Sequence, residues 1–373
     1  MERKRDDDAC PGALQVHQAA DGALARLRLP GGMISAAQLE SLAHTATEFG
    51  NDTLELTVRG NLQLRGVRDA TAVADAVAAA GLLPSPAHER VRNIVASPLS
   101  GRVGGLADVR PWVTELDIAI QADPDLARLP GRFLFGLDDG RGDISGLGAD
   151  VGAHVLPDGV ALLLAGRDTG IRLAADDVIA ALITVARRFV EIRGKSWRIV
   201  ELADVSVLIS DFDPTAPAGA TYEPVLRPPV GWITQDDDRV ALGAVVPLGV
   251  LTARQAEFVA AIAAPVVITP WRSLLVCDLA EGVADTSLRV LAPIGLVFDD
   301  TSPWLDISAC VGSPGCEKSR ADVRAEATRV VEEEHARLPS GHVHYVGCER
   351  ACGSPPTGQV LVATTEGFRP ASR

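Results

Sequence analysis

An internal repeat constrains the fold of this chain more than any other feature of its sequence. Residues 30–38 align with residues 247–255, and in both copies a hydroxyl residue is followed by glutamine three residues later. That spacing is the capping box with which many helices begin. Segments 56–64 and 267–276 align in the same way. Such a repeat predicts two copies of one supersecondary unit packed together.

The first copy has the element order of a ferredoxin-like module. Alternating apolar residues predict strands at 24–29, 54–58 and 62–65, while helical spacing predicts helices after Ser35 and over 69–80. Strand, helix, strand, strand and helix is the ferredoxin-like order. We therefore predict an α+β fold with a pseudo-two-fold duplication of ferredoxin-like half-domains.

The two copies differ in charge. Three arginines of the first copy are replaced in the second: Arg26 by Gly243, Arg28 by Val245 and Arg59 by Trp271. Arginine on a half-buried sheet is ordinarily a solvated strand face. Because the second copy keeps the pattern of the fold but not these charges, we predict instead one anion-binding site served by the first copy.

The rest of the chain is arranged around the two copies. A turn-rich, strand-forming region follows the first copy, and a Pro- and Ala-rich stretch without periodicity precedes the second. The predicted units are a flexible segment at 1–20, half-domain 1 at 21–83, an α+β domain at 84–210, a linker at 211–231, half-domain 2 at 232–290 and a second α+β domain at 291–373. In the last unit we predict a helix over about 320–338, with Ser319 as its N-cap, and a strand at 342–346.

Four of the six cysteines form two close pairs in the last unit: Cys310, Cys316, Cys348 and Cys352. Glycine and proline surround each pair, so the backbone can bend and bring four thiolates to one inorganic centre. Four thiolates suit an iron–sulfur cluster or tetrahedral zinc, and the lack of C-x2-C spacing favours iron–sulfur; unrelated thiols are the third interpretation. Cys10 and Cys277 are interpreted as packed or free thiols.

Charge and composition exclude several classes of function. The formal net charge of −14 argues against a nucleic-acid surface. No apolar run approaches the length of a membrane span, and the first ten residues lack the apolar core of a signal peptide. Clustered cysteines suit a reducing compartment. We therefore expect a cytoplasmic protein that binds neither nucleic acid nor membranes.

Several segments resemble the nitrite/sulfite reductase superfamily. They are 26–32, 56–63, 91–95, 129–133 and the cysteine pairs with C-x5-C and C-x3-C spacing. Each is short, but their order, together with the repeat, carries a resemblance over nearly the whole chain. Within the superfamily, segments 9–14 and 132–143 are similar to the oxygen-dependent branch of aerobic cobalamin biosynthesis, whose members convert precorrin-3A into precorrin-3B.

The resemblance implies roles for individual residues. The four paired cysteines match the ligands of a [4Fe-4S] cluster. Three arginines match the basic residues of the catalytic pocket: Arg26, Arg92 and Arg132. Three residues are expected to bind the carboxylates of a tetrapyrrole: Arg59, Gln63 and Arg65. Guanidinium groups suit these roles because they bind carboxylates through two hydrogen bonds and keep their proton.

Two positions depart from the reductase pattern. Leu134 and Glu55 stand where the reductases have a lysine and an arginine, so the pocket has less positive charge than reduction of a small oxyanion needs. The resemblance then implies that the tetrapyrrole is the substrate: dioxygen would hydroxylate precorrin-3A at a meso carbon, with γ-lactone formation, to give precorrin-3B. A sirohaem-dependent sulfite or nitrite reductase is the alternative.

The resemblance also implies a mononuclear non-haem iron and an electron donor of unknown identity. The sequence does not identify the iron ligands, and the candidates by residue type are Asp138, Asp139, Asp143, His154, His342 and His344. Turn carboxylates and surface or strand histidines are the plainer interpretation of these residues. A non-catalytic electron carrier or a zinc-stabilised binding protein is the hypothesis from another class, and analysis of zinc and acid-labile sulfide would distinguish it.

Overall fold

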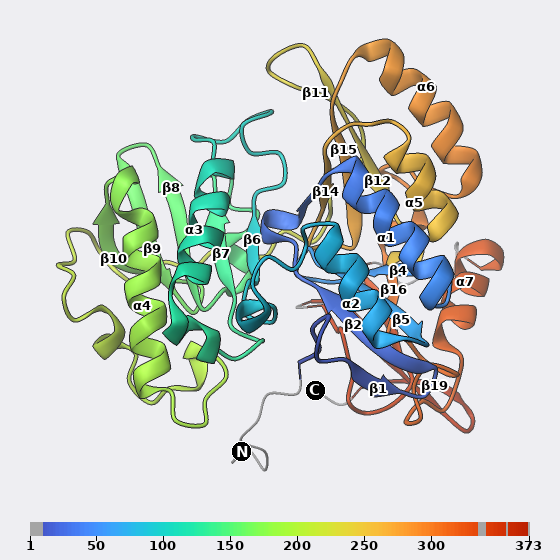
Figure 1. The fold of residues 1–373 in the computed structure, drawn as a ribbon, viewed down its shortest axis with the longest axis horizontal. Helices are drawn as coiled ribbons and strands as arrows, with labels where there is room; N and C mark the ends of the chain where they lie inside the picture. Colours follow the sequence, from blue (N-terminus) through green and yellow to red (C-terminus); the bar gives the residue numbers. More distant parts are fainter. Residues whose placement is uncertain (1–9, 335–340, 356, 372–373) are drawn as a thin grey trace.

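The computed structural model describes residues 10–334, 341–355 and 357–371. In these residues the chain forms three five-stranded β-sheets and one four-stranded sheet, with helices packed against them (Figure 1). The predicted α+β class is confirmed. Part of the predicted flexible segment and residues 335–338 of the predicted helix lie outside the described residues. In the described ranges, no helix has both the length and the apolar character needed to cross a membrane.

The two copies of the repeat form half-domains of the same design. The first consists of β1 (His17–Ala19), β2 (Gly22–Leu27), β3 (Met33–Ile34), α1 (Ala36–Phe49), β4 (Thr53–Leu56), β5 (Leu62–Val67) and α2 (Ala70–Ala79). The second consists of β11 (Gly231–Thr234), β12 (Val240–Val245), β13 (Val250–Thr252), α5 (Ala253–Ala260), β14 (Val266–Ile268), β15 (Ser273–Leu279) and α6 (Glu281–Leu291). Both predicted capping boxes are present: the side chains of Ser35 and Thr252 accept the backbone N–H groups of Gln38 and Gln255.

The half-domains exchange one strand each. β3 pairs with β14 of the second copy, and β13 pairs with β4 of the first, so each sheet contains a strand of the other copy. Short 3₁₀ turns, η1 (Pro30–Gly32) and η8 (Pro247–Gly249), precede the exchanged strands. Gly32 has a φ of 71°, and a Cβ atom there would overlap the carbonyl oxygen of Ile268. The close approach of the two backbones therefore requires glycine.

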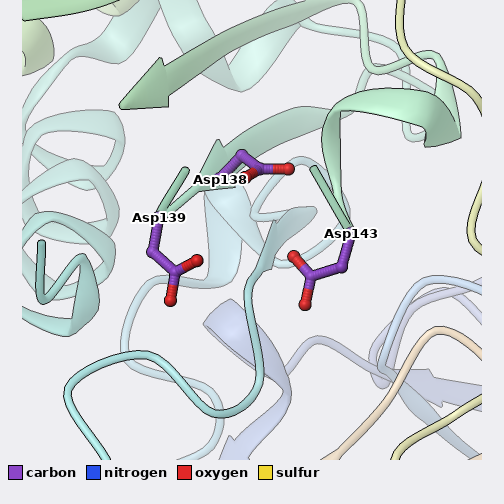
Figure 2. A group of neighbouring side chains, drawn as sticks. All are labelled: Asp138, Asp139 and Asp143. Carbon is purple, nitrogen blue, oxygen red and sulfur yellow. The ribbon is translucent and has the colours of Figure 1, made fainter. Parts of the chain in front are cut away.

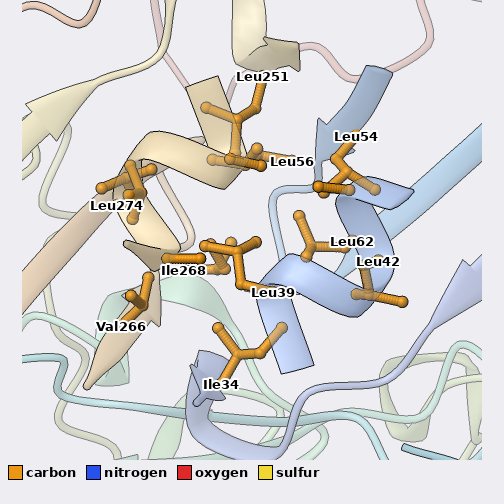
Figure 3. Packing of buried hydrophobic residues seen from close by; sticks show 14 of the residues in the cluster. Ile34, Leu39, Leu42, Leu54, Leu56, Leu62, Leu251, Val266, Ile268 and Leu274 are labelled. Atoms are coloured by element: carbon orange, nitrogen blue, oxygen red, sulfur yellow. The ribbon is translucent and has the colours of Figure 1, made fainter. Parts of the chain in front are cut away.

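One hydrophobic core serves both half-domains. Leu39 of α1 and Leu56 of β4 belong to the same buried cluster as Leu251 and Ile268 of the second copy (Figure 3). The helices α1 and α5 also contact each other. Burying a leucine or isoleucine side chain contributes roughly 2 kcal/mol. Separating the copies would expose many such side chains, so the duplicated unit is held together as one body.

The middle domain contains one sheet with the strand order β10-β9-β8-β7-β6. Its elements are β6 (Ile94–Ala96), α3 (Arg110–Ala122), β7 (Phe135–Asp138), β8 (Val151–Leu156), β9 (Gly159–Leu164), β10 (Arg167–Leu173) and α4 (Val178–Ile192). The strands β6, β7 and β8 are parallel, whereas β9 and β10 run antiparallel to their neighbours. Apolar residues of α3 and α4 pack on the sheet (Figure 1). The 3₁₀ turn η4 (Ser145–Leu147) follows β7.

The C-terminal unit brings the two cysteine pairs to one edge of its sheet. Its elements are β16 (Ile307–Ala309), α7 (Val323–Glu333), β17 (Val343–Val346), β18 (Gln359–Thr364) and β19 (Gly367–Pro370). Because β16 and β17 are parallel neighbours, the loops after them leave the sheet on the same side. The prediction of Ser319 as the N-cap of α7 is wrong. Asp322 caps the helix by accepting the N–H of Ala325, whereas the Ser319 hydroxyl donates to the Ala321 carbonyl.

Candidate active site

A pocket of about 440 Å³ lies where the half-domains, the middle domain and the C-terminal unit meet. Its cationic and aromatic lining residues are Arg59, Arg198, Arg272, His342, Trp271 and Trp304. Within the described ranges, no carboxylate is among the lining residues. A pocket with guanidinium groups and indole rings suits a ligand with an anionic edge and apolar faces.

Arg59 comes from the turn between β4 and β5. The Thr57 hydroxyl oxygen accepts the backbone N–H groups of Arg59 and Asn61, at 3.4 and 3.1 Å, and so shapes the turn. No carboxylate of the described residues forms an ion pair with the Arg59 guanidinium. Burial lowers the pKa of Arg59 to about 10, with the nearby cation of Arg198 as the next cause. A partly buried cation without an anionic partner indicates an anion-binding site.

Asp150 positions the second arginine of the pocket. Its Oδ2 atom lies 2.6 Å from Nε of Arg198, whose Nη2 donates to the Gly148 carbonyl at 2.6 Å. The same carboxylate accepts the backbone N–H groups of Leu134 and Ile199, at 2.9 and 2.7 Å. Leu134, one of the two departures from the reductase pattern, lies in the pocket wall. Asp150 therefore fixes both a charged and an apolar part of the lining.

The second copy also contributes to the pocket. Trp271, which aligns with Arg59, lines the pocket and donates its indole N–H to the Val225 carbonyl at 2.7 Å. The next residue, Arg272, supplies a guanidinium. The expectation that the first copy alone supplies the charge therefore needs correction. The sequence contained a clue to this arginine, because Arg272 aligns with the turn residue Gly60 of the first copy.

The four paired cysteines lie near one another beside the pocket. The Cys310 sulfur accepts the backbone N–H of Gly347 at 3.3 Å, which ties the first cysteine loop to the second. Burial raises the pKa of the Cys352 thiol, and the three other paired thiols all lie near enough to raise it further. The loops converge because β16 and β17 are parallel neighbours. The structure thus brings together the set that the sequence predicted as ligands of one inorganic centre.

Four thiolates suit either tetrahedral zinc or a [4Fe-4S] cluster. Among the described residues, no three of the four sulfurs lie within 4.8 Å of one another. The preference for a cluster therefore rests on the cysteine spacing in the sequence. The N–H donated to Cys310 is a hydrogen bond of the kind that stabilises a cluster thiolate.

A hydrogen-bonded chain connects the pocket to the second cysteine loop. The Ser308 hydroxyl lies 2.7 Å from Nε2 of His342, which lines the pocket, and 2.7 Å from Nδ1 of His344. Nε2–H of His344 donates to the Cys352 carbonyl at 3.0 Å. Nδ1 of His342 faces the Leu305 carbonyl at 3.3 Å. All four ring nitrogens therefore face protein partners, and the two histidines position the loop rather than offer free metal ligands.

Arg26 and Gln63 belong to a polar network beside the pocket and are not among its lining residues. Nη2 of Arg26 donates to Oε1 of Gln63 at 3.0 Å, and Nε2 of Gln63 donates to Oε2 of Glu55 at 2.6 Å. Glu55, the other departure, forms an ion pair with Arg324 of α7 at 2.6 Å. The network joins the first half-domain to the C-terminal unit.

Arg65 contacts a cysteine loop rather than the pocket. Its Nε and Nη2 atoms donate to the two carboxylate oxygens of Asp21, at 2.9 and 2.8 Å. Nη2 also donates to the carbonyl of Gly315, the residue before Cys316, at 3.0 Å. In this conformation Arg65 buttresses the first cysteine loop, and its predicted role in holding a substrate carboxylate has no support from the geometry.

The two remaining predicted pocket arginines lie in the middle domain and outside the pocket lining. Arg92 is buried and forms a two-point ion pair with Asp117 of α3, at 2.6 and 2.8 Å. Arg132 is exposed, and its guanidinium carbon lies 5.0 Å from the centre of the Trp197 ring. Of the six arginine and glutamine residues predicted from the sequence, Arg59 lines the pocket.

Three buried carboxylates meet at the end of β7 (Figure 2). The iron-ligand candidates of this domain come together there: Asp138, Asp139 and Asp143, with His154 at 3.4 Å from Asp138. Asp138 accepts four backbone N–H groups, Asp139 pairs with Arg141, and Asp143 accepts the Ser97 hydroxyl. These partners occupy the carboxylates, so the three aspartates stabilise the turn after β7. We assign no iron to them.

The pH dependence of stability tests whether Asp143 is buried among these carboxylates as the structure shows. Burial raises the pKa of Asp143 to about 7, the Ser97 hydroxyl opposes the shift, and Asp138 adds to it. Between about pH 4 and pH 7 the unfolded state releases this proton while the folded state retains it, so the free energy of unfolding falls as pH rises. We expect Asp143→Asn to remove roughly 2 kcal/mol of the difference in unfolding free energy between pH 5 and pH 7.5. Urea unfolding at both pH values measures this difference.

The matched control is Asp75→Asn on the exposed side of α2, which should keep the wild-type dependence on pH. An Asp143→Asn protein with the same pH dependence as wild type would contradict the raised pKa. A wild-type free energy of unfolding that rises between pH 5 and pH 7.5 would contradict it as well.

Comparison with known proteins defines the class to which this architecture belongs. The description "Nitrite/Sulfite reductase ferredoxin-like half domain" matches residues 17–80. The structure of the NirA protein of Mycobacterium tuberculosis superposes with a TM-score of 0.77 over 94% of this chain and 73% of NirA, at 20% sequence identity. The chain has the nitrite/sulfite reductase fold.

The similarity extends to named relatives. A precorrin-3B synthase of Sinorhizobium sp is 28% identical, and the alignment covers 96% of this chain and 81% of the relative. A sulfite reductase [ferredoxin] of Mycobacterium tuberculosis is 25% identical over 88% of this chain and 67% of the reductase. The resemblance predicted from the sequence is confirmed, and the relatives with known activity are oxidoreductases or enzymes of cobalamin biosynthesis.

Proposed function

We propose that this protein is a precorrin-3B synthase, which hydroxylates precorrin-3A with dioxygen and closes a γ-lactone in aerobic cobalamin biosynthesis. The observation that carries the proposal is the pocket: cationic and aromatic groups, and no carboxylate among its described lining residues, beside four converging cysteines. Precorrin-3A is a tetrapyrrole with acetate and propionate arms, so its edge is anionic and its faces are apolar. Similarity to a precorrin-3B synthase over nearly the whole chain supports the same conclusion.

In the proposed reaction the protein holds the substrate by its carboxylates. Arg59 presents a guanidinium without an ion-pair partner among the described residues, and guanidinium binds carboxylate through two parallel hydrogen bonds. Arg198, which Asp150 holds in place, adds positive charge beside it. Trp271 and Trp304 offer ring surfaces to the macrocycle. One oxygen atom of dioxygen enters the product and the other leaves as water. Two electrons and two protons must therefore come from a separate electron donor.

Cys310, Cys316, Cys348 and Cys352 would hold the [4Fe-4S] cluster. Such a cluster supplies electrons one at a time. Their position at the pocket wall supports delivery of electrons to a bound macrocycle, because Gly353 and Ser354 directly after Cys352 line the pocket. The mononuclear non-haem iron implied by the resemblance remains part of the proposal, but the carboxylate and histidine candidates are occupied by protein partners and no ligands are assigned to it.

A sirohaem-dependent sulfite or nitrite reductase is the second candidate, and the similarity to a sulfite reductase supports it. Leu134 in the pocket wall counts against this candidate, because an apolar side chain there withholds positive charge from a small oxyanion. In the reductase the tetrapyrrole is a bound cofactor, whereas in the synthase it is exchanged at every turnover.

Anaerobic purification followed by absorption, iron and sulfide analysis distinguishes the two candidates. We expect cluster iron and sulfide without the absorption bands of sirohaem. We then expect turnover of added precorrin-3A, with oxygen and a chemical reductant, to a product whose mass has increased by one oxygen atom. Sirohaem bands in the purified protein together with sulfite reduction would establish the reductase instead. Zinc without sulfide would exclude both candidates.

A further inference from the structure

Arg272 occupies a turn position that glycine occupies in the other copy of the repeat. In the first copy the Gly60 N–H donates to the Thr57 carbonyl at 3.2 Å, and in the second the Arg272 N–H donates to the Thr269 carbonyl at 3.2 Å. The backbones agree as well, with φ values of 64° for Gly60 and 58° for Arg272. The two turns are therefore equivalent, and an arginine stands at a left-handed position.

A left-handed backbone strains any residue that has a Cβ atom. At Gly60 glycine is required in any case, because a Cβ atom there would lie 2.9 Å from the Ile268 carbonyl oxygen. At Arg272 the chain accepts the strain. Other non-glycine residues, including Leu248 of the same pocket, also have positive φ, so the case for Arg272 depends on where its guanidinium lies.

The Arg272 side chain passes two glycines, and a side chain at either position would collide with it. A Cβ atom on Gly249 would lie 2.9 Å from Cδ of Arg272, and one on Gly353 would lie 2.6 Å from its Nη2 atom. Nη1 lies 3.5 Å from the carbonyl of Ala309, the residue before Cys310. The guanidinium thus lies at the wall between the pocket and the two cysteine loops.

This guanidinium lies near the Cys310 thiol but has no carboxylate partner among the described residues. In the described part of the chain no carboxylate forms an ion pair with Arg272, and the Ala309 carbonyl that it contacts stands at the limit of hydrogen-bond distance. The carboxylate that affects it electrostatically, Glu55, is already paired with Arg324. Burial lowers the pKa of Arg272, and the Arg324 cation lowers it further. An anionic group in the pocket would remove this imbalance.

We propose that Arg272 binds a carboxylate arm of the ligand at the cysteine wall of the pocket, while Arg59, from the equivalent turn of the first copy, binds another arm. The inference rests on the proposed function, because it takes the ligand to be a polycarboxylate tetrapyrrole. It adds a residue that fixes which edge of the macrocycle faces the cysteine loops. A ligand without a carboxylate at that edge would leave Arg272 unpaired and bind more weakly.

Binding of uroporphyrin III, a tetrapyrrole with acetate and propionate arms, tests the inference without requiring turnover. Fluorescence titration would compare wild type with Arg272→Gly and Arg272→Lys. We expect Arg272→Gly to weaken binding at least about tenfold, since a charged hydrogen-bonded pair is lost, and Arg272→Lys to give an intermediate loss. The unfolding midpoint of Arg272→Gly should not fall, because glycine relieves the strained backbone.

The control for the backbone change is Ala263→Gly, which also replaces a residue at positive φ, 57°, by glycine, but at an exposed position outside the pocket. It should bind uroporphyrin like wild type. The effects of Arg59→Ala and Arg272→Gly should multiply in the double variant, because the two residues are taken to bind separate carboxylates.

The outcomes separate the two proposals. If wild type and both Arg272 variants bind uroporphyrin equally, the role of Arg272 is overturned and the proposed function stands. Unchanged uroporphyrin binding in Arg272→Gly, together with a shifted reduction potential of the cluster, would also overturn the binding role of Arg272. It would show that Arg272 acts on the cluster instead. If wild type does not bind uroporphyrin, the tetrapyrrole function fails and the inference fails with it.

Discussion

Replacing Cys352 by serine is expected to abolish the proposed iron–sulfur centre and with it all turnover. The pKa of the Cys352 thiol is raised first by burial and then by the three other paired cysteines, so it lies near each of them. A serine hydroxyl at this position is a poor ligand for cluster iron, and the remaining three thiols would leave one iron unsupported. The expected result is a protein that has lost most of its iron, acid-labile sulfide and visible absorption.

The control is Cys277, which is fully buried in an apolar cluster of the second half-domain. Burial raises the pKa of its thiol to about 11, so it remains protonated and does not bind metal. Cys277→Ala should therefore keep the full iron and sulfide content. Equal loss of iron in both variants would contradict the assignment of the ligands, and a wild-type protein that contains zinc in place of iron and sulfide would contradict the cluster itself.

The sequence predicted the half-domains because their signals are local. Capping boxes, turn glycines and alternating strands depend on residues a few positions apart, and each appears twice. The exchange of β3 and β13 was not predicted, since it depends on which backbone edge lies nearest after the copies pack. Local patterns carry no information about that choice. The same limit applies to α7, where Ser319 and Asp322 are both good N-cap residues and packing decides between them.

The candidate site was predicted only in part, for a related reason. Cysteine spacing predicted a metal-ligand set, because four thiolates in Gly- and Pro-rich loops have few other uses, and the four cysteines do lie near one another. Arginine spacing was less informative. Arg92 finds its ion-pair partner, Asp117, on a helix that follows later in the chain, and no pattern in the sequence relates the two residues. Arg272 could have been found, because an arginine aligned with a turn glycine is an anomaly within the repeat.

Gly32→Ala is expected to lower the free energy of unfolding by at least about 3 kcal/mol. The residue has a φ of 71°, and its Cβ atom would overlap the Ile268 carbonyl oxygen, so both the backbone and the exchanged pairing of β3 with β14 must shift. Because each sheet contains a strand of the other copy, damage at this crossing weakens both half-domains. Urea unfolding would measure the change.

Two glycine controls separate the causes of this loss. Gly142 has a φ of 80°, and a Cβ atom there would meet nothing within 4 Å, so Gly142→Ala should lose only about 1 kcal/mol from backbone strain. Gly282 lies in α6 with open space around it, and Gly282→Ala should stabilise by about 0.5–1 kcal/mol. If Gly32→Ala lost no more stability than Gly142→Ala, the backbone crossing would not hold the copies together. A larger loss at Gly32 means that the duplication and the pocket it encloses depend on one carbonyl contact that only glycine permits.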